Sequence, residues 1–380
     1  MERWGLDCVV ATSYAGSYYL SGAPIHPFGR PMATIIPLHG DAAMVTSIIE
    51  EPHTAVQSWI GDRRTYYDYG PRPAYDDPRT PLESFTQLVA EVLWERGIGQ
   101  GRIGYEEVHL PVQQFEMLTR EIPRATFVGA SAILEQLRAV LSHEELRLVR
   151  AADEISDVGL GYLLRAIGPG RTARELTASC RAVMTDAVVD RFPGMPFHMH
   201  IDCGLGADAR SAGHSEWTTW DQNTVVTSNR LLELVTSVWL WGYWGNVERA
   251  AYVGTPTPVV RRAFNAMVEA NEAAIAAIRP GVQVHEIDRL TKAVLARHGY
   301  GTRSGSGCGR GIVSYEANAR EQRMDLRLYS DVVLEPGMAF SLEPDLHLPG
   351  VGTFRHCNTI IVSDDGCEVD SQLPRGPLVL

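Results

Sequence analysis

The sequence predicts an α+β protein of two domains, and three observations carry this prediction. The chain has 380 residues, which is enough for two domains of ordinary size. Residues 1 to about 140 alternate short strand-like and helix-like segments, whereas the rest of the chain has longer helices and a long apolar hairpin. Two helix ends in this second part repeat at a fixed spacing, which indicates a duplicated unit. We therefore expect a small α/β domain over residues 1–141 and a larger, duplicated α+β domain over residues 142–380.

The overall composition is that of a globular protein with neither a nucleic-acid nor a membrane partner. Hydrophobic residues make up 45% of the chain and charged residues 21%. The formal net charge of −12 argues against nucleic acid, since a phosphate-binding face needs clustered positive charge. The sequence shows no signal-peptide pattern and no apolar run of membrane-spanning length. A cytoplasmic location is expected, because the six cysteines have no CxxC spacing: Cys8, Cys180, Cys203, Cys308, Cys357 and Cys367.

Helix-capping and helix-terminating residues indicate where elements of the first domain begin and end. Thr80, Pro81 and Glu83 form a capping box with proline at the first helical position, and Gly97 ends the helix that follows. Strands are expected at Asp7–Ser13, Met32–Pro37, Arg102–Glu106 and Ala125–Gly129, with a second helix near residues 111–121.

The second domain carries an internal repeat. Residues 166–170 and 277–281 each contain a helix end followed by a Pro-Gly break, and the offset is 277 − 166 = 111. Glu175 and Glu286 follow with the same offset, in the helix that begins after each break. The helix that leads into the first copy opens at a capping box that begins with Ser142. A duplicated unit predicts a pseudo-twofold core with a cleft between its halves, which is a common place for a site.

Residues 229–254 form a long apolar stretch, NRLLELVTSVWLWGYWGNVERAAYVG. Its β-branched and aromatic residues favour two paired strands with a Gly-Tyr corner over a helix. Glu248 and Arg249 follow the apolar run. They could form a surface ion pair at a strand end. They could equally be buried site residues, since charges inside such a run need partners. Both interpretations stay open.

Five groups in the second domain could take part in chemistry. They are His214 in SAGHSE, Glu248, Cys308 in the glycine-rich SGSGCGRG, Glu343 at a strand end, and the Arg355-His356-Cys357 triplet before the apolar strand NTIIV. For any such residue taken alone, a structural role is the more frequent one. The glycines around Cys308 let the backbone pass close to a ligand or to another segment. A nucleophilic role for its thiol is not favoured, because no histidine stands nearby in the sequence.

Five motifs, together with the duplication, carry a family resemblance: GYWGNVERAAYVG, IRPGVQVHEID, GSGCGRGIVSYE, LEPGMAFSLEP and FRHCNTIIV. They cover residues 145 to 375, which is nearly the whole second domain. On these motifs the domain resembles the pita-bread fold of methionine aminopeptidases, prolidases and creatinase. The segments YYLSG and PFGR give the first domain a resemblance to the N-terminal domain of creatinase and prolidase relatives.

The same resemblance argues against a metal centre. Peptidases of this superfamily hold two metal ions with two aspartates, one histidine and two glutamates. Those positions fall here on Val235, Asn246, Cys308, Glu343 and Cys357. Only Glu343 keeps a suitable oxygen ligand, and hard divalent ions need several carboxylates to hold them against water. We therefore expect no metal ion and no other cofactor, and a metal-dependent Xaa-Pro peptidase is disfavoured.

Creatinase is the metal-free member of the superfamily, and this chain resembles it where the peptidases differ. The resemblance implies that His214 is the general acid and base and that Glu248 and Glu343 bind a cation. Two carboxylates suit a planar amidinium or guanidinium, and a histidine can move protons near neutral pH. Further residues expected at the substrate are Arg327, the aromatic Tyr243 and Trp244, Cys308 and His356, with Phe28 and Arg30 reaching the site from the partner chain of a homodimer.

The resemblance thus predicts a metal-independent, creatinase-like hydrolase of a non-peptide C–N bond. Its substrate is expected to be a small cationic or zwitterionic molecule with a guanidino, amidino or amide group. Creatine itself is not singled out, because Cys308 and Cys357 replace histidines of creatinase, Ala250 replaces a threonine, and a related metal-free member opens the cyclic amidine of ectoine. Two alternatives stay open. The pocket could serve a non-hydrolytic biosynthetic step such as cyclisation, elimination or isomerisation, or the domain could be a catalytically dead binding module.

Overall fold

The computed structural model describes residues 1–25, 30–67, 80–205, 223–302, 305–311 and 325–380. The chain divides into two compact units, Met1–Leu137 and Arg138–Leu380. Their mixture of helices and sheets confirms the predicted α+β class. None of the described helices combines the length and the apolar character that a membrane crossing requires.

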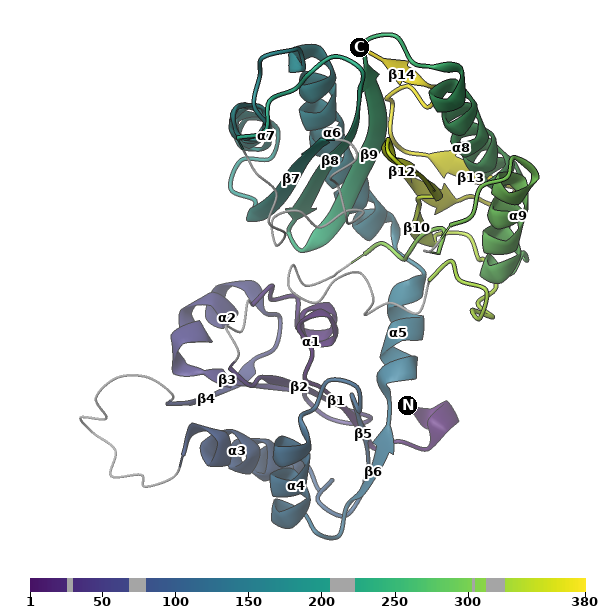
Figure 1. The fold of residues 1–380 in the computed structure, drawn as a ribbon. Helices are drawn as coiled ribbons and strands as arrows, with labels where there is room; N and C mark the ends of the chain where they lie inside the picture. The colour runs from purple at the N-terminus through teal and green to yellow at the C-terminus, as the bar shows by residue number, and fades with distance from the viewer. Residues whose placement is uncertain (26–29, 68–79, 206–222, 303–304, 312–324) are drawn as a thin grey trace. The chain divides into compact units, whose positions relative to one another are not determined.

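The first unit is a six-stranded mixed sheet with helices packed against it (Figure 1). Its strands are β1 (Cys8–Ala11), β2 (Ala33–Pro37), β3 (Ala43–Ser47), β4 (Asp62–Tyr66), β5 (Arg102–Tyr105) and β6 (Thr126–Gly129). Its helices are α1 (Tyr14–Ser21), α2 (Glu51–Gln57), α3 (Pro81–Glu95), α4 (Val112–Glu121) and α5 (Ser131–Ala139), with 3₁₀ turns at Glu2–Trp4 and Ile48–Glu50. The strand order is β4-β3-β2-β1-β5-β6, in which β2 is antiparallel to both of its neighbours.

The capping box of α3 shows how local sequence sets these elements. The hydroxyl of Thr80 accepts a hydrogen bond from the backbone N–H of Glu83 (3.2 Å), and the Glu83 carboxylate accepts one from the N–H of Thr80 (2.6 Å). Phe85, Val89 and Leu93 follow on one face of the helix and are buried against the sheet. The strands and helices predicted for this unit are present, with ends moved by a residue or two.

The second unit contains an eight-stranded sheet and two pairs of helices (Figure 1). Its strands are β7 (Phe197–Leu205), β8 (Arg230–Leu240), β9 (Tyr243–Val253), β10 (Ala339–Leu342), β11 (Asp345–Leu348), β12 (Gly352–Val362), β13 (Cys367–Val369) and β14 (Leu378–Val379). Its helices are α6 (His143–Ala166), α7 (Ala173–Arg191), α8 (Pro258–Ala277) and α9 (Val284–Arg297). The main strand order is β10-β12-β9-β8-β7, with β11 and β13 added on β12 and β14 on β9.

The helix pairs α6–α7 and α8–α9 confirm the internal repeat. α6 ends at Ala166 and α8 at Ala277, while α7 begins at Ala173 and α9 at Val284. Both offsets are 111 residues, since 277 − 166 = 111 and 284 − 173 = 111. α6 and α7 contact β7, β8 and β9, whereas α8 contacts β11 and β12. Each copy therefore consists of a helix pair with its own strands.

β8 and β9 form the predicted hairpin and pair antiparallel along their whole length. Trp241 and Gly242 turn the chain between them, both with positive φ (51° and 80°), so the corner lies one residue before the predicted Gly-Tyr pair and Tyr243 already belongs to β9. In β9, Gly245 is required by close packing. A Cβ at this position would lie 2.5 Å from the backbone carbonyl carbon of Ala152 and the backbone nitrogen of Asp153 in α6. The hairpin therefore lies directly against α6.

The two halves of the unit meet where β9 pairs with β12. The register sets His356 opposite Arg249 and Cys357 opposite Glu248. The Arg355-His356-Cys357 triplet was expected to precede a strand, and this was wrong: it lies within β12, because the residues up to Arg355 already pair with β11. Glu248 and Arg249 are 3% and 0% exposed in the middle of β9, so the surface-pair interpretation is also wrong.

Candidate active site

Three carboxylates surround the guanidinium of Arg355 at this junction. Its Nε forms a short ion pair with Oε2 of Glu248, and its Nη1 lies 3.8 Å from Oε2 of Glu343. Its Nη2 lies 3.4 Å from Oε1 of Glu233. Arg355, Glu233 and Glu248 are buried, whereas the Glu343 side chain is 19% exposed. We call Glu233, Glu248, Glu343 and Arg355 the acidic cluster.

Burial and mutual charge set the protonation of the acidic cluster. Desolvation raises the pKa of Glu233 to about 8, although Arg355 opposes the shift. Desolvation also raises the pKa of Glu248. Burial disfavours the charge of Arg355, but Glu248, Glu233 and Glu343 outweigh burial and hold its pKa well above the ordinary value. One guanidinium cannot neutralise three carboxylates, so the acidic cluster favours an added proton or an added cation.

A second buried guanidinium, that of Arg310, lies beside the acidic cluster. Its Nη2 is 3.5 Å from the backbone oxygen of Asn246 and 3.6 Å from Sγ of Cys357. Its central carbon lies 3.9 Å from the centre of the Trp244 ring. The Asn246 side chain donates to Oε1 of Glu248 at 3.2 Å and lies 3.4 Å from Sγ of Cys357. Alternation along β9 accounts for this arrangement, because Trp244, Asn246 and Glu248 point to the same face.

Cys308 lies beside Glu343, against β10. The backbone passes close there, because a Cβ on Gly307 would lie 1.8 Å from the carbonyl oxygen of Ser341. This confirms the close approach that the glycine-rich segment predicts. The N–H of Cys308 donates to Oγ of Ser341 (2.9 Å), and this hydroxyl donates to Oε1 of Glu343 (2.8 Å). Burial raises the pKa of Cys308 to about 12, so its thiol, 3.6 Å from the same Oε1, is a neutral donor.

The donor set does not fit the metal pair of the superfamily's peptidases. Glu248, Glu343 and Cys357 do offer ligand atoms that all lie within 4.8 Å of one another. However, Arg355 pairs with both carboxylates, and burial raises the pKa of Cys357 well above the usual range. Asn246 directs its amide nitrogen at Glu248 and thus donates. A neutral thiol, an amide and a guanidinium among two carboxylates do not rebuild a dinuclear site for hard divalent ions.

Three predicted site residues are not placed beside the acidic cluster. His214 and Phe28 lie in segments outside the described residues. Arg30 belongs to the first unit, whereas the acidic cluster belongs to the second. The catalytic role of His214 and the substrate contacts of Phe28 and Arg30 remain predictions.

The two aromatic residues predicted to face a substrate cation have partners within the protein. The hydroxyl of Tyr243 donates to Oε1 of Glu145, 3.0 Å away, at the start of α6. The ring of Trp244 carries the guanidinium of Arg310 on its face. Trp244 therefore does bind a cation, and this cation is the protein's own arginine.

Arg327 and His356 are also held by other groups. Nε of Arg327 lies 3.9 Å from a carboxylate oxygen of Asp325, and its side chain is 28% exposed. His356 alternates with Arg355 along β12 and so points to the opposite face. Its ring nitrogens lie 3.1 and 3.4 Å from two backbone carbonyl oxygens, and burial lowers its pKa to about 3. From this strand, Arg355 faces the carboxylates.

Sequence reasoning did not single out Glu233 or Arg310, and it treated Arg355 only as part of a triplet. A signal for each exists in the sequence. Glu233 interrupts the apolar LLELVTSV as Glu248 interrupts the strand that follows, and Arg310 ends the glycine-rich GSGCGR. A charge inside such a segment needs a partner, and the argument made for Glu248 applies equally to these three residues.

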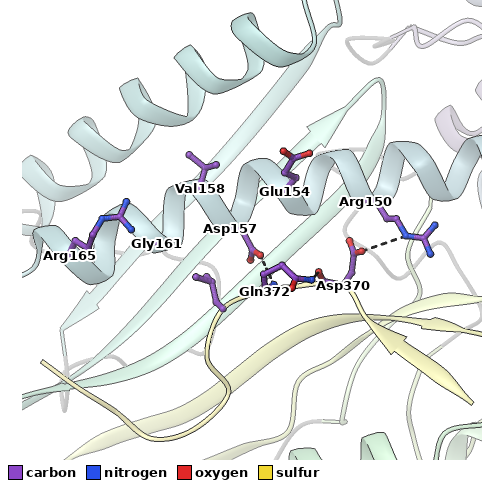
Figure 2. A pocket seen from close by; sticks show the side chains of 9 residues that line it. Arg150, Glu154, Asp157, Val158, Gly161, Arg165, Asp370 and Gln372 are labelled. Atoms are coloured by element: carbon purple, nitrogen blue, oxygen red, sulfur yellow. Dashed lines mark hydrogen bonds and ion pairs between the residues drawn. The ribbon is translucent and has the colours of Figure 1, made fainter.

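A cavity of about 560 Å³ lies between α6 and the chain that follows β13 (Figure 2). It is lined by Arg150, Glu154, Asp157, Val158, Gly161, Arg165, Asp370, Gln372 and Leu373. Two of its charged groups are already engaged, as the dashed lines in Figure 2 mark. Nε of Arg150 lies 3.6 Å from a carboxylate oxygen of Asp370, and Asp157 accepts a hydrogen bond from the backbone N–H of Gln372 at 2.7 Å. None of the predicted site residues lines this cavity, so the acidic cluster is the better candidate.

Comparisons with known proteins agree with this fold. The model of metallopeptidase family M24 matches residues 147–364, and that of the creatinase/prolidase N-terminal domain matches residues 1–140. The ectoine hydrolase of Halomonas elongata is 25% identical over 99% of this chain and 93% of its own length. The creatinase of a Bacillus species is 23% identical over 99% of this chain and 89% of its own. The solved Xaa-Pro dipeptidase from Bacillus anthracis has 23% identity and a TM-score of 0.79, covering 100% of this chain and 96% of its own.

Proposed function

The chain belongs to metallopeptidase family M24, and we propose that it is a metal-independent hydrolase within this family. The proposed substrate is a small cationic or zwitterionic molecule, cleaved at a non-peptide C–N bond of a guanidino, amidino or amide group. One observation carries the proposal: Glu248 and Glu343 hold a guanidinium between them, beside Asn246, Cys308 and Cys357, which the family resemblance equates with metal-ligand positions.

Binding of a planar cation follows from the placement of the two carboxylates. A guanidinium or amidinium presents N–H groups on more than one edge, and charge-assisted hydrogen bonds to carboxylates are the strong ones. The guanidinium of Arg355 already lies between Glu248 and Glu343, which supports a match between this pair and a planar cation. Arg327 and Arg30 of a partner chain are proposed to hold a carboxylate of the substrate, and Phe28 of that chain is proposed to contact the substrate beside them.

His214 is the proposed general base and acid. It takes a proton from water as the water oxygen forms a bond to the amidine or amide carbon. The C–N bond then breaks, and His214 returns the proton to the leaving nitrogen. Glu248 and Glu343 keep the carbon in line with the attacking water. Every atom of the products comes from the substrate and one water molecule.

The curated relatives support a hydrolase. The ectoine hydrolase and the creatinase both align with nearly the whole of this chain. The neutral thiols and the amide at the expected ligand positions, with the guanidinium of Arg355 beside them, argue against a metal-dependent Xaa-Pro peptidase in spite of the dipeptidase fold. We further propose that the enzyme works as a cytoplasmic homodimer, since Phe28 and Arg30 need a partner chain within reach of its site.

A substrate screen in labelled water tests this function. Guanidino acids, cyclic amidines and small amides would be offered, and product masses would show whether oxygen from H₂¹⁸O is incorporated. Hydrolysis predicts one labelled oxygen in the product. An active protein that yields unlabelled product would instead establish a cyclisation, elimination or isomerisation.

Variants then test the residue roles. We expect Glu248→Gln and Glu343→Gln each to lower kcat/KM by about 10²-fold or more, because a buried charged partner is lost. His214→Ala is expected to bind substrate and to lose kcat by about 10²- to 10⁴-fold. Glu269→Gln, on the exposed side of α8, is the control and should retain activity. A His214→Ala variant with normal turnover would refute the mechanism.

A further inference from the structure

Arg355 occupies the oxygen atoms that the proposed function gives to the substrate. Its Nε is paired with Oε2 of Glu248, and its Nη1 is 3.8 Å from Oε2 of Glu343. The Arg355 side chain is 9% exposed and projects from β12, so it is a buried part of the site. A substrate cation and Arg355 therefore compete for the same two carboxylates.

Glu233 offers Arg355 another partner. Both carboxylate oxygens of Glu233 are buried without a hydrogen bond among the described residues, and the side chain is 4% exposed. Oε1 of Glu233 lies 3.4 Å from Nη2 of Arg355. A charge-assisted N–H···O bond is about 2.7–2.9 Å long, so the contact with Glu233 is incomplete while Arg355 is paired with Glu248, and it can shorten when the guanidinium leaves Glu248. Because burial raises the pKa of Glu233 to about 8, its carboxyl group carries a proton near neutral pH. A guanidinium that moves onto Glu233 displaces this proton and gives the buried carboxylate a charged partner.

We propose that Arg355 occupies the substrate-cation position in the free protein. Its guanidinium moves onto Glu233 when a planar amidinium or guanidinium binds Glu248 and Glu343. The inference rests on the proposed function and narrows its substrate to a planar cation with donors on two edges. The guanidinium of Arg355 already contacts both carboxylates, which indicates that a substrate group of the same shape fits between them. An ammonium carries its donors on a single atom and spans this pair poorly, so it displaces Arg355 poorly. Glu233 is thus a positioning residue that acts through Arg355.

The movement needs no change in the fold. β12 is held by β11, β10 and β9 on both sides of Arg355, so its backbone is fixed. Glu233 lies in β8, which pairs along its length with β9, the strand of Glu248. Both partners of Arg355 therefore stay in place, and only the guanidinium exchanges between them.

Binding of methylguanidinium, with methylammonium as the non-planar comparison, tests the exchange by calorimetry. Wild type should bind methylguanidinium and bind methylammonium more weakly. In Glu233→Gln, we expect Kd for methylguanidinium to rise about tenfold or more, since Arg355 loses its second partner. Glu233→Asp, which keeps a carboxyl group that can ionise when Arg355 moves onto it, should recover part of the affinity, and Glu269→Gln should match wild type. Equal Kd values for wild type and Glu233→Gln would overturn the proposal.

A double-mutant cycle tests whether Glu233 affects ligand affinity through Arg355 or only through its own charge. The proposal requires that Glu233→Gln has no effect on Kd once Arg355→Met has removed the competing guanidinium. The same tenfold loss in both backgrounds would mean that Glu233 acts by charge alone, and would overturn the exchange. For variants that fail to fold, a wild-type crystal with methylguanidinium gives a direct answer. The distance from Nη2 of Arg355 to Oε1 of Glu233 should fall below 3 Å, and an unchanged Arg355 would overturn the proposal.

These outcomes are separate from those of the proposed function. Displacement of Arg355 by methylguanidinium, without hydrolysis of any C–N substrate, would retain the exchange and reject the hydrolase. Hydrolysis that depends on Glu248 and Glu343 but not on Glu233 would retain the hydrolase and reject the exchange.

Discussion

Arg310 lies with its guanidinium 3.9 Å from the centre of the Trp244 ring, and Trp244 stacks on Trp239 with ring centres 5.6 Å apart. The hydrogen bonds of Arg310 within the described part of the chain go to Thr359, Asn246 and Cys357, so the aromatic stack gives this fully buried cation a further favourable face. Replacing Trp244 therefore leaves a cavity and exposes a buried charge at once.

Trp244→Leu is expected to lower the free energy of unfolding by about 3 kcal/mol, as lost packing and a lost cation–π contact add. Urea unfolding followed by circular dichroism would measure it. The control is Trp4→Leu, because Trp4 is 42% exposed and should cost no more than about 1 kcal/mol. Equal losses for the two variants would contradict the role given to the stack.

Arg249 should prove to be one of the most sensitive structural positions. Its buried guanidinium donates to the backbone oxygens of Glu248 (2.8 Å), Cys357 (2.9 Å) and Pro374 (2.8 Å), so it ties both central strands to the C-terminal segment. Arg249→Met leaves these buried carbonyls unpaired and should cost about 3–5 kcal/mol of unfolding free energy. Arg297→Met, at a side chain 68% exposed, should cost less than about 1 kcal/mol. A loss of less than about 1 kcal/mol for Arg249→Met would show that water or other donors satisfy these carbonyls.

The pH dependence of stability should reveal Glu233. Its pKa in the folded protein is about 8, because burial outweighs the attraction of Arg355, while Glu248, Asp202 and Asp345 add repulsion. The folded state therefore binds this proton more tightly than the unfolded state. Stability should fall as pH rises from the ordinary carboxyl range to about 8, and this loss should level off above it.

Glu233→Gln isolates this effect, because the amide cannot ionise. Thermal unfolding would be measured at pH 5, 6.5 and 8. The stability of the variant relative to wild type should increase as the pH rises, by roughly a few kcal/mol of unfolding free energy at most. Glu248, whose pKa is also raised by burial, is present in both proteins, so the difference reports the ionisation of Glu233 together with its repulsion from Glu248. A constant difference across the range would show that Glu233 keeps an ordinary pKa.

The altered ligand set predicts indifference to divalent metal ions. Wild-type protein treated with EDTA should keep its activity and its melting temperature, and added Mn²⁺ or Zn²⁺ should not raise the melting temperature. The comparison protein carries four substitutions that restore the ligands of the superfamily's peptidases: Val235→Asp, Asn246→Asp, Cys308→His and Cys357→Glu. This variant should be stabilised by Mn²⁺ in a chelator-sensitive way. Stoichiometric metal in purified wild type would return the peptidase interpretation.

Much of the fold could be read from local sequence, because short-range interactions set the element ends. The capping boxes at Thr80 and Ser142 begin helices where the sequence predicts them, since each side chain satisfies a free N–H within three residues. The break after Ala166 recurs after Ala277 and exposes the duplication. Strand pairing is different. That Cys357 lies opposite Glu248 depends on contacts 109 residues apart (357 − 248 = 109), which no local pattern encodes.

The candidate site was predictable only in part, for the same reason. Glu248 and Glu343 stand out as charges that follow apolar strands. A buried charge at Arg355 could have been suspected, but not that Arg355 is their shared partner, because the pairing depends on how β9 and β12 join. His356, its neighbour, drew attention as a histidine, yet alternation along the strand turns it to the opposite face.

The acidic cluster draws two of its members from each copy of the duplicated unit. Glu233 and Glu248 lie on the hairpin of the first copy, whereas in the second copy Arg355 lies in β12 and Glu343 lies between β10 and β11. Neither copy alone can therefore bind the proposed cation. A substitution in one copy changes the charge balance felt by the other, so the four positions are expected to vary together among related sequences, as a single unit of selection.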